Sequence, residues 1–263
     1  MNYFVDERSI VRQIWGRADT TLFIFAGAAA EFALNKAVDW LYFTGRLPAD
    51  PLDRLFSTVT YARQILFSEE ETALKSIHHI TAIHKSVEAS RGADIPPWAY
   101  RDVLFLLIDY SIRSFELLDR KLTPAEKDEV FNVFYRVGTG MQLTDLPTDF
   151  TGWEKMRAEH LEQNLVCSTF TADLYLQYKK HLGILRFTIL KQVQLLTVPN
   201  RVSNMLSLPA TPWLLPFLKI YKVLRRNQLE GLLKNVLLPI KYKAQILQMD
   251  KGFPHKKQPM LIK

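Results

Sequence analysis

The chain has 263 residues and one cysteine, Cys167; 48% of its residues are hydrophobic and 23% are charged. These values are typical of a globular protein with one large core, and the single cysteine excludes a disulfide framework and a cysteine-rich metal site. The formal net charge is +7, and residues 214–263 alone carry eleven Lys and Arg against Glu230 and Asp250, so the basic character is C-terminal.

The N-terminal part of the chain predicts a buried helix rather than a membrane span. Its apolar run, residues 20–30, is followed by Glu31 and Lys36, so it is shorter than the roughly 20 residues that cross a bilayer. Asp19 is placed to cap this helix, which we expect to reach about Asn35. The charged N-terminus lacks the apolar core of a signal peptide, so we expect a cytoplasmic protein.

Helix start signals recur along the rest of the chain, whereas strand patterns bounded by hairpin turns are nearly absent. An Asp-Pro pair at 50–51 opens a helix, and Thr123 with Glu126 and Thr151 with Glu154 fit capping boxes. We therefore expect an all-α protein. The expected helices cover 51–67, 69–91, 98–119, 125–141, 152–164, 169–180 and 184–206, with two more between 213 and 248.

Prolines mark the expected helix breaks, because the residue before a proline disfavours helical geometry. Pro199 can either break the helix over 184–206 or kink it. We expect one multi-helix domain over residues 1–252, followed by a flexible basic tail at 253–263.

One face of the expected helix 51–67 carries polar residues. Arg54, Thr58, Tyr61 and Ile65 are spaced at i, i+4, i+7 and i+11, so they share that face. Two interpretations stay open. Arg54 can pair with a surface carboxylate while Thr58 bonds back to a helical carbonyl. Alternatively, the two residues contact a bound anionic or oxygen-bearing group.

His84 lies on an apolar helical stripe formed by Ala73, Ile77, Ile80, His84 and Val87. A histidine on a buried helix face needs a partner for its polar ring nitrogens. If His84 is a core residue, that partner is a hydrogen-bonding group; if His84 is a metal ligand, the partner is the metal. Both interpretations stay open on the residues alone.

The other histidines give weaker signals. His78 and His79 lie off the face of His84, so we expect them at the surface. His160, which has acidic neighbours, and His181, which lies beside Gly183, are expected to be surface or helix-capping residues. No glycine-rich phosphate loop is present, so nucleotide binding has no support.

The segment after Trp213 predicts a basic amphipathic helix, with Lys219, Lys222, Arg225 and Arg226 among apolar residues. Such a helix can lie on an anionic membrane, or it can pack on the core with its basic heads in water. Nucleic-acid binding is not expected, because these residues belong to no recognisable reading motif.

Several of these segments, taken in order, resemble the haem-dependent oxygenases of the MpaB and rubber-oxygenase type, over about residues 11–239. The carriers are Arg54-Leu-Phe-Ser-Thr58, Ala82-Ile-His84-Lys-Ser-Val87, Tyr100-Arg-Asp102, Asp145-Leu-Pro147 and Leu215-Pro216. The resemblance implies an all-helical fold with a globin-like core around haem b. It also implies His84 as the iron ligand, with Arg54 and Thr58 close to the haem in cofactor-binding and catalytic roles.

The implied activity is that of a haem b-dependent oxygenase that uses dioxygen to cleave a carbon–carbon double bond in an apolar, isoprenoid or lipid-like substrate. Ser57 stands where rubber oxygenase has a lysine, so rubber itself is not carried over. Lys36, Glu31 and Asp19 are the candidates for a distal base. The alternatives are a non-catalytic or peroxidase-like haem protein and a haem-free helical module at a membrane surface.

Overall fold

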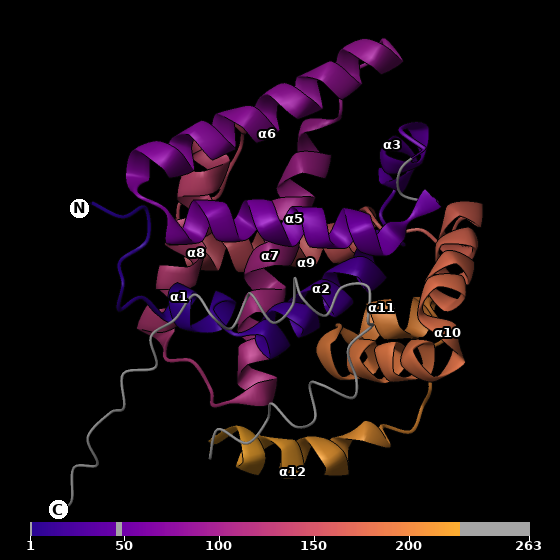
Figure 1. The fold of residues 1–263 in the computed structure, drawn as a ribbon. Coiled ribbons are helices and arrows are strands. Elements are labelled where there is room, and N and C mark those ends of the chain that lie inside the picture. Colours follow the sequence, from indigo (N-terminus) through magenta and orange to yellow (C-terminus); the bar gives the residue numbers. More distant parts are fainter. Residues whose placement is uncertain (1, 46–48, 227–263) are drawn as a thin grey trace, which may run out of the picture.

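The structure is a computed structural model that describes residues 2–45 and 49–226, and these residues form eleven helices and no strand (Figure 1). The all-α prediction is confirmed, while the globin-like core stays a prediction. The helices are α1 (Ile10–Trp15), α2 (Ala18–Phe32), α3 (Val38–Phe43), α5 (Pro51–Phe67), α6 (Glu70–Arg91), α7 (Pro97–Leu118), α8 (Pro124–Gly140), α9 (Phe150–Gln163), α10 (Thr169–Thr197), α11 (Asn200–Met205) and α12 (Leu214–Arg226).

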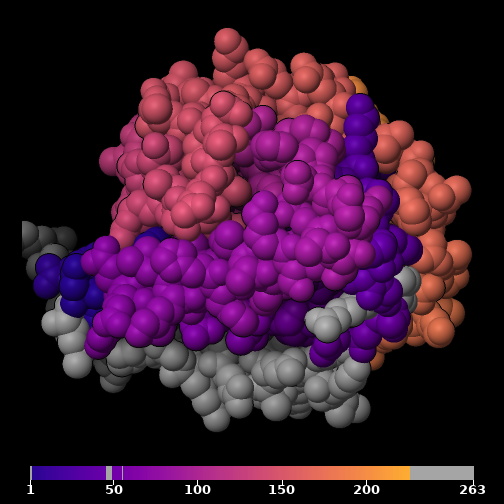
Figure 2. Space-filling model, turned by 90° about the horizontal axis from the view of Figure 1, so that it is seen from above, coloured from indigo at the N-terminus to yellow at the C-terminus, as the bar shows by residue number. Residues whose placement is uncertain are grey.

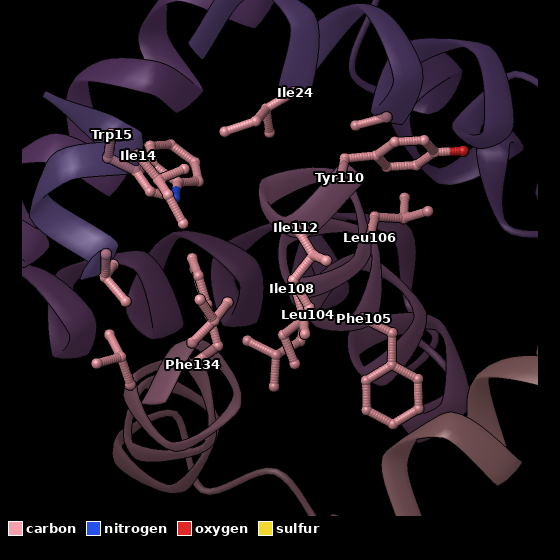
Figure 3. Close-up of a cluster of buried hydrophobic side chains, with 14 of the residues drawn as sticks. Ile14, Trp15, Ile24, Leu104, Phe105, Leu106, Ile108, Tyr110, Ile112 and Phe134 are labelled. Atoms are coloured by element: carbon pink, nitrogen blue, oxygen red, sulfur yellow. The ribbon is translucent and has the colours of Figure 1, made fainter. Parts of the chain in front are cut away.

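The core is built around the contact between α2 and α7. Trp15, Ile24, Tyr110 and Phe134 are fully or almost fully buried there (Figure 3), and each large side chain of this kind stabilises the fold by about 1.5–3 kcal/mol. Gly27 allows the two helices to approach closely, because a Cβ at this position would lie 2.4 Å from Cδ1 of Tyr110.

Helices α5 and α6 form an antiparallel hairpin on one side of this core (Figure 1). The Asp50 side chain accepts the amide of Asp53 and Pro51 occupies the first turn of α5, so the predicted start of this helix is confirmed. Helix α6 lies at the surface and forms much of the face seen in Figure 2. Its first half is anchored by buried Ala73 and Ile77.

Some predicted helix ends are wrong by one turn or less. The α2 helix starts at Ala18, so Asp19 lies in its first turn rather than at its cap. The Thr123–Glu126 capping box is confirmed, but α9 is capped by Asp149, whose carboxylate accepts the amide of Gly152, and not by Thr151. In α9 a neighbouring residue takes the predicted role, whereas the N-cap residue of α2, Arg17, makes no side-chain capping bond.

The predicted break near residue 183 is a kink within α10. Gly183 has φ 72°, a left-handed conformation that favours glycine. The second half of α10 ends at Thr197, and Pro199 separates it from α11. The prediction that Pro199 breaks the helix over 184–206 is confirmed, and the alternative of a kink is wrong, because Val198 adopts an extended conformation.

Within the described residues, none of the helices has the length and apolar character that a membrane span requires. The predicted helix that reaches residue 248, and the predicted basic tail at 253–263, lie outside the described residues.

Candidate functional site

The hairpin of α5 and α6 brings two of the three predicted site residues, Arg54 and His84, near each other. Helix α5 ends at Phe67 and α6 begins at Glu70, so residues equally far from this turn face each other across the hairpin. The rings of Tyr61 and His79 pair in this way, with centroids 6.1 Å apart. In the same register Arg54 lies opposite His84, close enough for its charge to lower the pKa of the imidazole.

His84 is half-buried, and within the described part of the chain its Nδ1 is buried without a hydrogen-bond partner. The pKa of His84 is lowered to about 4, mainly by burial and then by the charge of Arg54, while Glu88 opposes the shift. The ring is therefore neutral at pH 7, which is the protonation state that a metal ligand requires. His78 and His79 are exposed, as predicted.

Glu88 lies one turn after His84 and is 5% exposed. Its Oε1 accepts hydrogen bonds from the Tyr100 hydroxyl at 2.9 Å and from the Ile95 amide at 3.0 Å, and its Oε2 lies 2.8 Å from Nζ of Lys85. These contacts hold the start of α7 against the end of α6. They also place the Tyr100 ring edge-on to His84, with centroids 5.2 Å apart.

Thr58 and Ser57 both donate their hydroxyls to the carbonyl of Arg54, at 3.0 and 2.8 Å. The local interpretation of Thr58, a hydroxyl bonded back to its own helix, is therefore the one realised in this structure. Each hydroxyl oxygen keeps acceptor capacity after donating its proton. Thr58 and Arg54 are both half-buried.

Aromatic residues of α3 lie at the same end of α6. Arg91 pairs with Asp39 at 2.6 Å and its guanidinium lies 4.0 Å from the ring centroid of Trp40. Arg91 is two turns after His84 on α6, so these aromatic residues pack at the C-terminal end of that helix. The residues that act on His84 come from α5, α6 and α7, namely Arg54, Glu88 and Tyr100.

A second cluster of ionisable residues fills the core, and it corrects the prediction for His160. This residue is 3% exposed rather than superficial. Its Nε2 lies 2.8 Å from Oε1 of Glu31 and its Nδ1 lies 2.7 Å from Oδ1 of Asp102. Arg157, one turn earlier on α9, bonds both Glu31 and Asp109. Tyr110 donates to Glu31 at 2.7 Å.

The electrostatics of this cluster fix its protonation. Burial alone raises the pKa of Glu31, but Arg157 and His160 overcome it and lower the pKa to about 2. Burial lowers the pKa of His160, but Asp102 and Glu31 overcome this effect and raise it. The two carboxylates therefore favour the imidazolium form of His160, and the cluster ties α2, α7 and α9 together. We refer to it as the core ion network.

The three proposed distal bases are engaged in other contacts. Glu31 belongs to the core ion network. Lys36 donates from Nζ to the carbonyl of Gln163. Asp19 pairs with Arg225 at 3.1 Å and accepts the Tyr221 hydroxyl at 2.8 Å. The same contact corrects the prediction for Arg225, which is 4% exposed and does not present its charge at the surface.

Among the described residues no three His, Cys, Asp or Glu side chains form a group that could hold a bare metal ion. Two open grooves lie along residues 2–9 and α8, away from the residues around His84. A single neutral histidine is the ligand set of a haem iron rather than of a structural zinc, which needs several side chains.

Comparison with protein families decides the relationship of the chain. Residues 12–225 match the family described as the ER-bound oxygenase mpaB/B'/rubber oxygenase catalytic domain. The chain belongs to this family. No curated protein and no solved structure matches it. Membership of the mpaB/rubber oxygenase family supports oxygenase activity, and the match contains Arg54, Thr58 and His84 as well as the core ion network.

Sequence reasoning missed two kinds of residue in this family member. The sequence pointed to the two residues of the Glu88–Tyr100 contact only separately. Tyr100 stands in the Tyr100-Arg-Asp102 segment, and Glu88 is one turn after His84. The core ion network had a periodic signal, with Asp102 and Asp109 seven apart on α7 and Arg157 and His160 three apart on α9. Neither spacing by itself reveals the partner on another helix.

Proposed function

We propose that this chain is a haem b-dependent oxygenase in which His84 ligates the iron. The substrate is an apolar, isoprenoid or lipid-like molecule, and the reaction with dioxygen cleaves a carbon–carbon double bond. Family membership supports the oxygenase activity. The cofactor, the ligand and the substrate class are the proposal.

The observation that carries the proposal is the state of His84. A half-buried imidazole that is neutral and has an unpartnered buried nitrogen is costly unless it gains a partner. An iron ligand supplies that partner for one ring nitrogen and strengthens any hydrogen bond made by the other. At His160, by contrast, both ring nitrogens lie within 2.8 Å of a carboxylate oxygen and the pKa is raised, which favours the protonated ring that has no lone pair for a metal.

The residues around His84 fit a flat apolar group with anionic substituents. Ile80 and Val87, on the His84 stripe, are only half-buried, and beyond His78 the one buried residue of α6 is Glu88. Arg54 provides a guanidinium on the facing helix that can hold a carboxylate. Thr58 offers a hydroxyl oxygen on the same face, and Tyr100 restricts the rotation of the His84 ring.

His84 would hold the haem through its iron, and the bound haem would supply the activation of dioxygen. The addition of one dioxygen across a carbon–carbon double bond yields two carbonyl groups, so this cleavage needs no external reductant. The protein then has to orient the double bond and exclude water. Apolar side chains on α6, such as Ile80 and Val87, suit this task, because they bind a hydrocarbon without offering competing hydrogen bonds.

The test is the visible absorption spectrum of protein produced with haem supply, together with its iron content. We expect a Soret band and about one iron per chain in the wild type, and loss or displacement of the band in His84→Ala. The matched control is His79→Ala on the same helix, which removes an exposed imidazole and should leave the spectrum unchanged. Haem-loaded protein is then incubated with unsaturated isoprenoids under oxygen, and carbonyl products are measured.

Three results would contradict the proposal. The first is the absence of a Soret band when folded protein is mixed with hemin. The second is a wild-type spectrum in His84→Ala. Haem binding without carbonyl products from any unsaturated substrate would support a haem protein that is not an oxygenase of this type. Circular dichroism of each variant separates loss of the cofactor from loss of the fold.

A further inference from the structure

Among the described residues, helix α12 is docked on the protein through the face that carries Leu218, Tyr221 and Arg225. Leu218 is 6% exposed, and Arg225 pairs with Asp19 and donates to Thr20 at 3.0 Å. The Tyr221 hydroxyl donates to Asp19 at 2.8 Å. These contacts attach α12 to the start of α2 and fix which side of the helix faces outward.

The opposite face carries large apolar side chains. Trp213 is 41% exposed, and Phe217, Ile220 and Val223 are 59%, 60% and 61% exposed within the part of the chain that the structure describes. Their spacing of four, three and three residues places them on one stripe. Burial of such side chains normally stabilises a protein, and a contiguous exposed set marks an interaction surface. We call these four residues the α12 stripe.

Positive charge accompanies the α12 stripe. Lys219 is exposed, Lys222 is half-buried, and residues 214–226 contain no acidic residue. The following residues 227–263 add seven Lys and Arg against Glu230 and Asp250. Two possible occupants of the stripe are residues 227–263 and a second copy of the chain. Both carry a net positive charge, so neither complements the lysines of α12. An anionic partner is the electrostatically complementary one.

We propose that the α12 stripe docks on an anionic lipid surface. Apolar residues beside lysines are the pattern by which amphipathic helices lie in a membrane interface, with the apolar stripe inserted and the amines at the headgroups. Tryptophan at the edge of such a stripe suits the interface, because its ring is apolar and its N–H is polar. The inference rests on this surface and is independent of haem binding at His84.

The test is co-sedimentation of the full chain with vesicles of phosphatidylcholine alone and of phosphatidylcholine mixed with phosphatidylserine. We expect binding to the mixed vesicles, weak binding to the neutral ones, and a decline with added salt because exposed charges are screened. Phe217→Asp together with Ile220→Asp should lower the vesicle affinity by about tenfold or more. The matched control is Leu176→Asp, at a 64% exposed position on α10, which should bind like the wild type.

A second variant separates charge from apolar insertion. Lys219→Glu keeps the α12 stripe and should weaken binding to the mixed vesicles while leaving the weak binding to neutral vesicles unchanged. The proposal is overturned if the wild type does not bind mixed vesicles, or if Leu176→Asp loses binding as strongly as the stripe variant. It is also overturned if the stripe variant lowers thermal stability or the molecular mass in solution, because the stripe is then covered by residues 227–263 or by a second copy.

Discussion

Two buried or half-buried histidines show how the environment of a side chain decides its chemistry. His160 lies between Glu31 and Asp102, so its pKa is raised and it is held as a cation. Burial, and then the positive charge of Arg54, lower the pKa of His84 to about 4, so this ring is neutral, and within the described residues its Nδ1 has no hydrogen-bond partner. The ring nitrogens of His160 are engaged by carboxylates of the core ion network, whereas the neutral ring of His84 can bind a ligand. The predictions below test this difference.

The largest expected effect comes from removing the central cation of the core ion network. Arg157→Met leaves Glu31 and Asp109 buried without their main counter-charge, and we expect a loss of about 3–5 kcal/mol in the free energy of unfolding. Urea unfolding measures this change. The control is Lys75→Ala, which removes an exposed partner of Glu71 and should leave the midpoint unchanged. A variant as stable as the wild type would show that the network does not hold α2, α7 and α9 together.

His160→Gln tests the charge on that histidine. We expect a loss of about 1–3 kcal/mol, because the amide cannot replace both charged contacts. The raised pKa of His160 means that its stabilising contribution is complete below about pH 6.5 and is lost as the pH rises through its folded pKa. The difference in melting temperature between wild type and variant should therefore shrink above neutral pH. A constant difference across this range would contradict the cationic state.

A smaller effect is expected at the contact that positions His84. Tyr100→Phe removes the hydrogen bond to Glu88 and should cost about 1 kcal/mol, because Glu88 keeps the Ile95 amide and Lys85. The ring remains, so haem binding should persist while the Soret position shifts slightly. Tyr110→Phe is the matched variant in the core ion network. If Tyr100→Phe and Tyr110→Phe lowered the free energy of unfolding equally, the surroundings of His84 and the core ion network would not differ in their contribution to stability.

The smallest effect on stability is expected at His84 itself. The side chain is half-buried and its Nδ1 makes no hydrogen bond in the described structure, so His84→Ala should change the free energy of unfolding of haem-free protein by less than about 1 kcal/mol. The same variant should abolish haem binding. A large stability loss in haem-free protein would instead mean that His84 is a structural residue, as His160 is.

Much of the local structure could be predicted from the sequence. The start of α5 at Pro51 and the capping box at Thr123 depend on contacts within one helical turn, and both are confirmed. The exposure of His78 and His79 followed from helical spacing alone. The failure at Thr151 is also local, since Asp149 caps the helix instead, whereas the break expected at Pro199 is confirmed.

The candidate site could be predicted only in part. The sequence placed Arg54 and Thr58 on one helix and His84 on the next, and the antiparallel hairpin brings the helices together in that register. It assigned His160 to the surface, because acidic neighbours on the same helix suggested a solvated face. The partners that bury this residue, Glu31 and Asp102, come from α2 and α7.

The sequence by itself determined the helices, their caps and the apolar stripe that carries His84, because these depend on interactions over three or four residues. The tertiary structure decided which histidine has its pKa raised and which has it lowered, and that Arg225 is buried while Val223 on the same helix is exposed. The physical reason is that a pKa and a burial depend on groups nearby in space, and Glu31 and His160 meet across a separation of 129 residues.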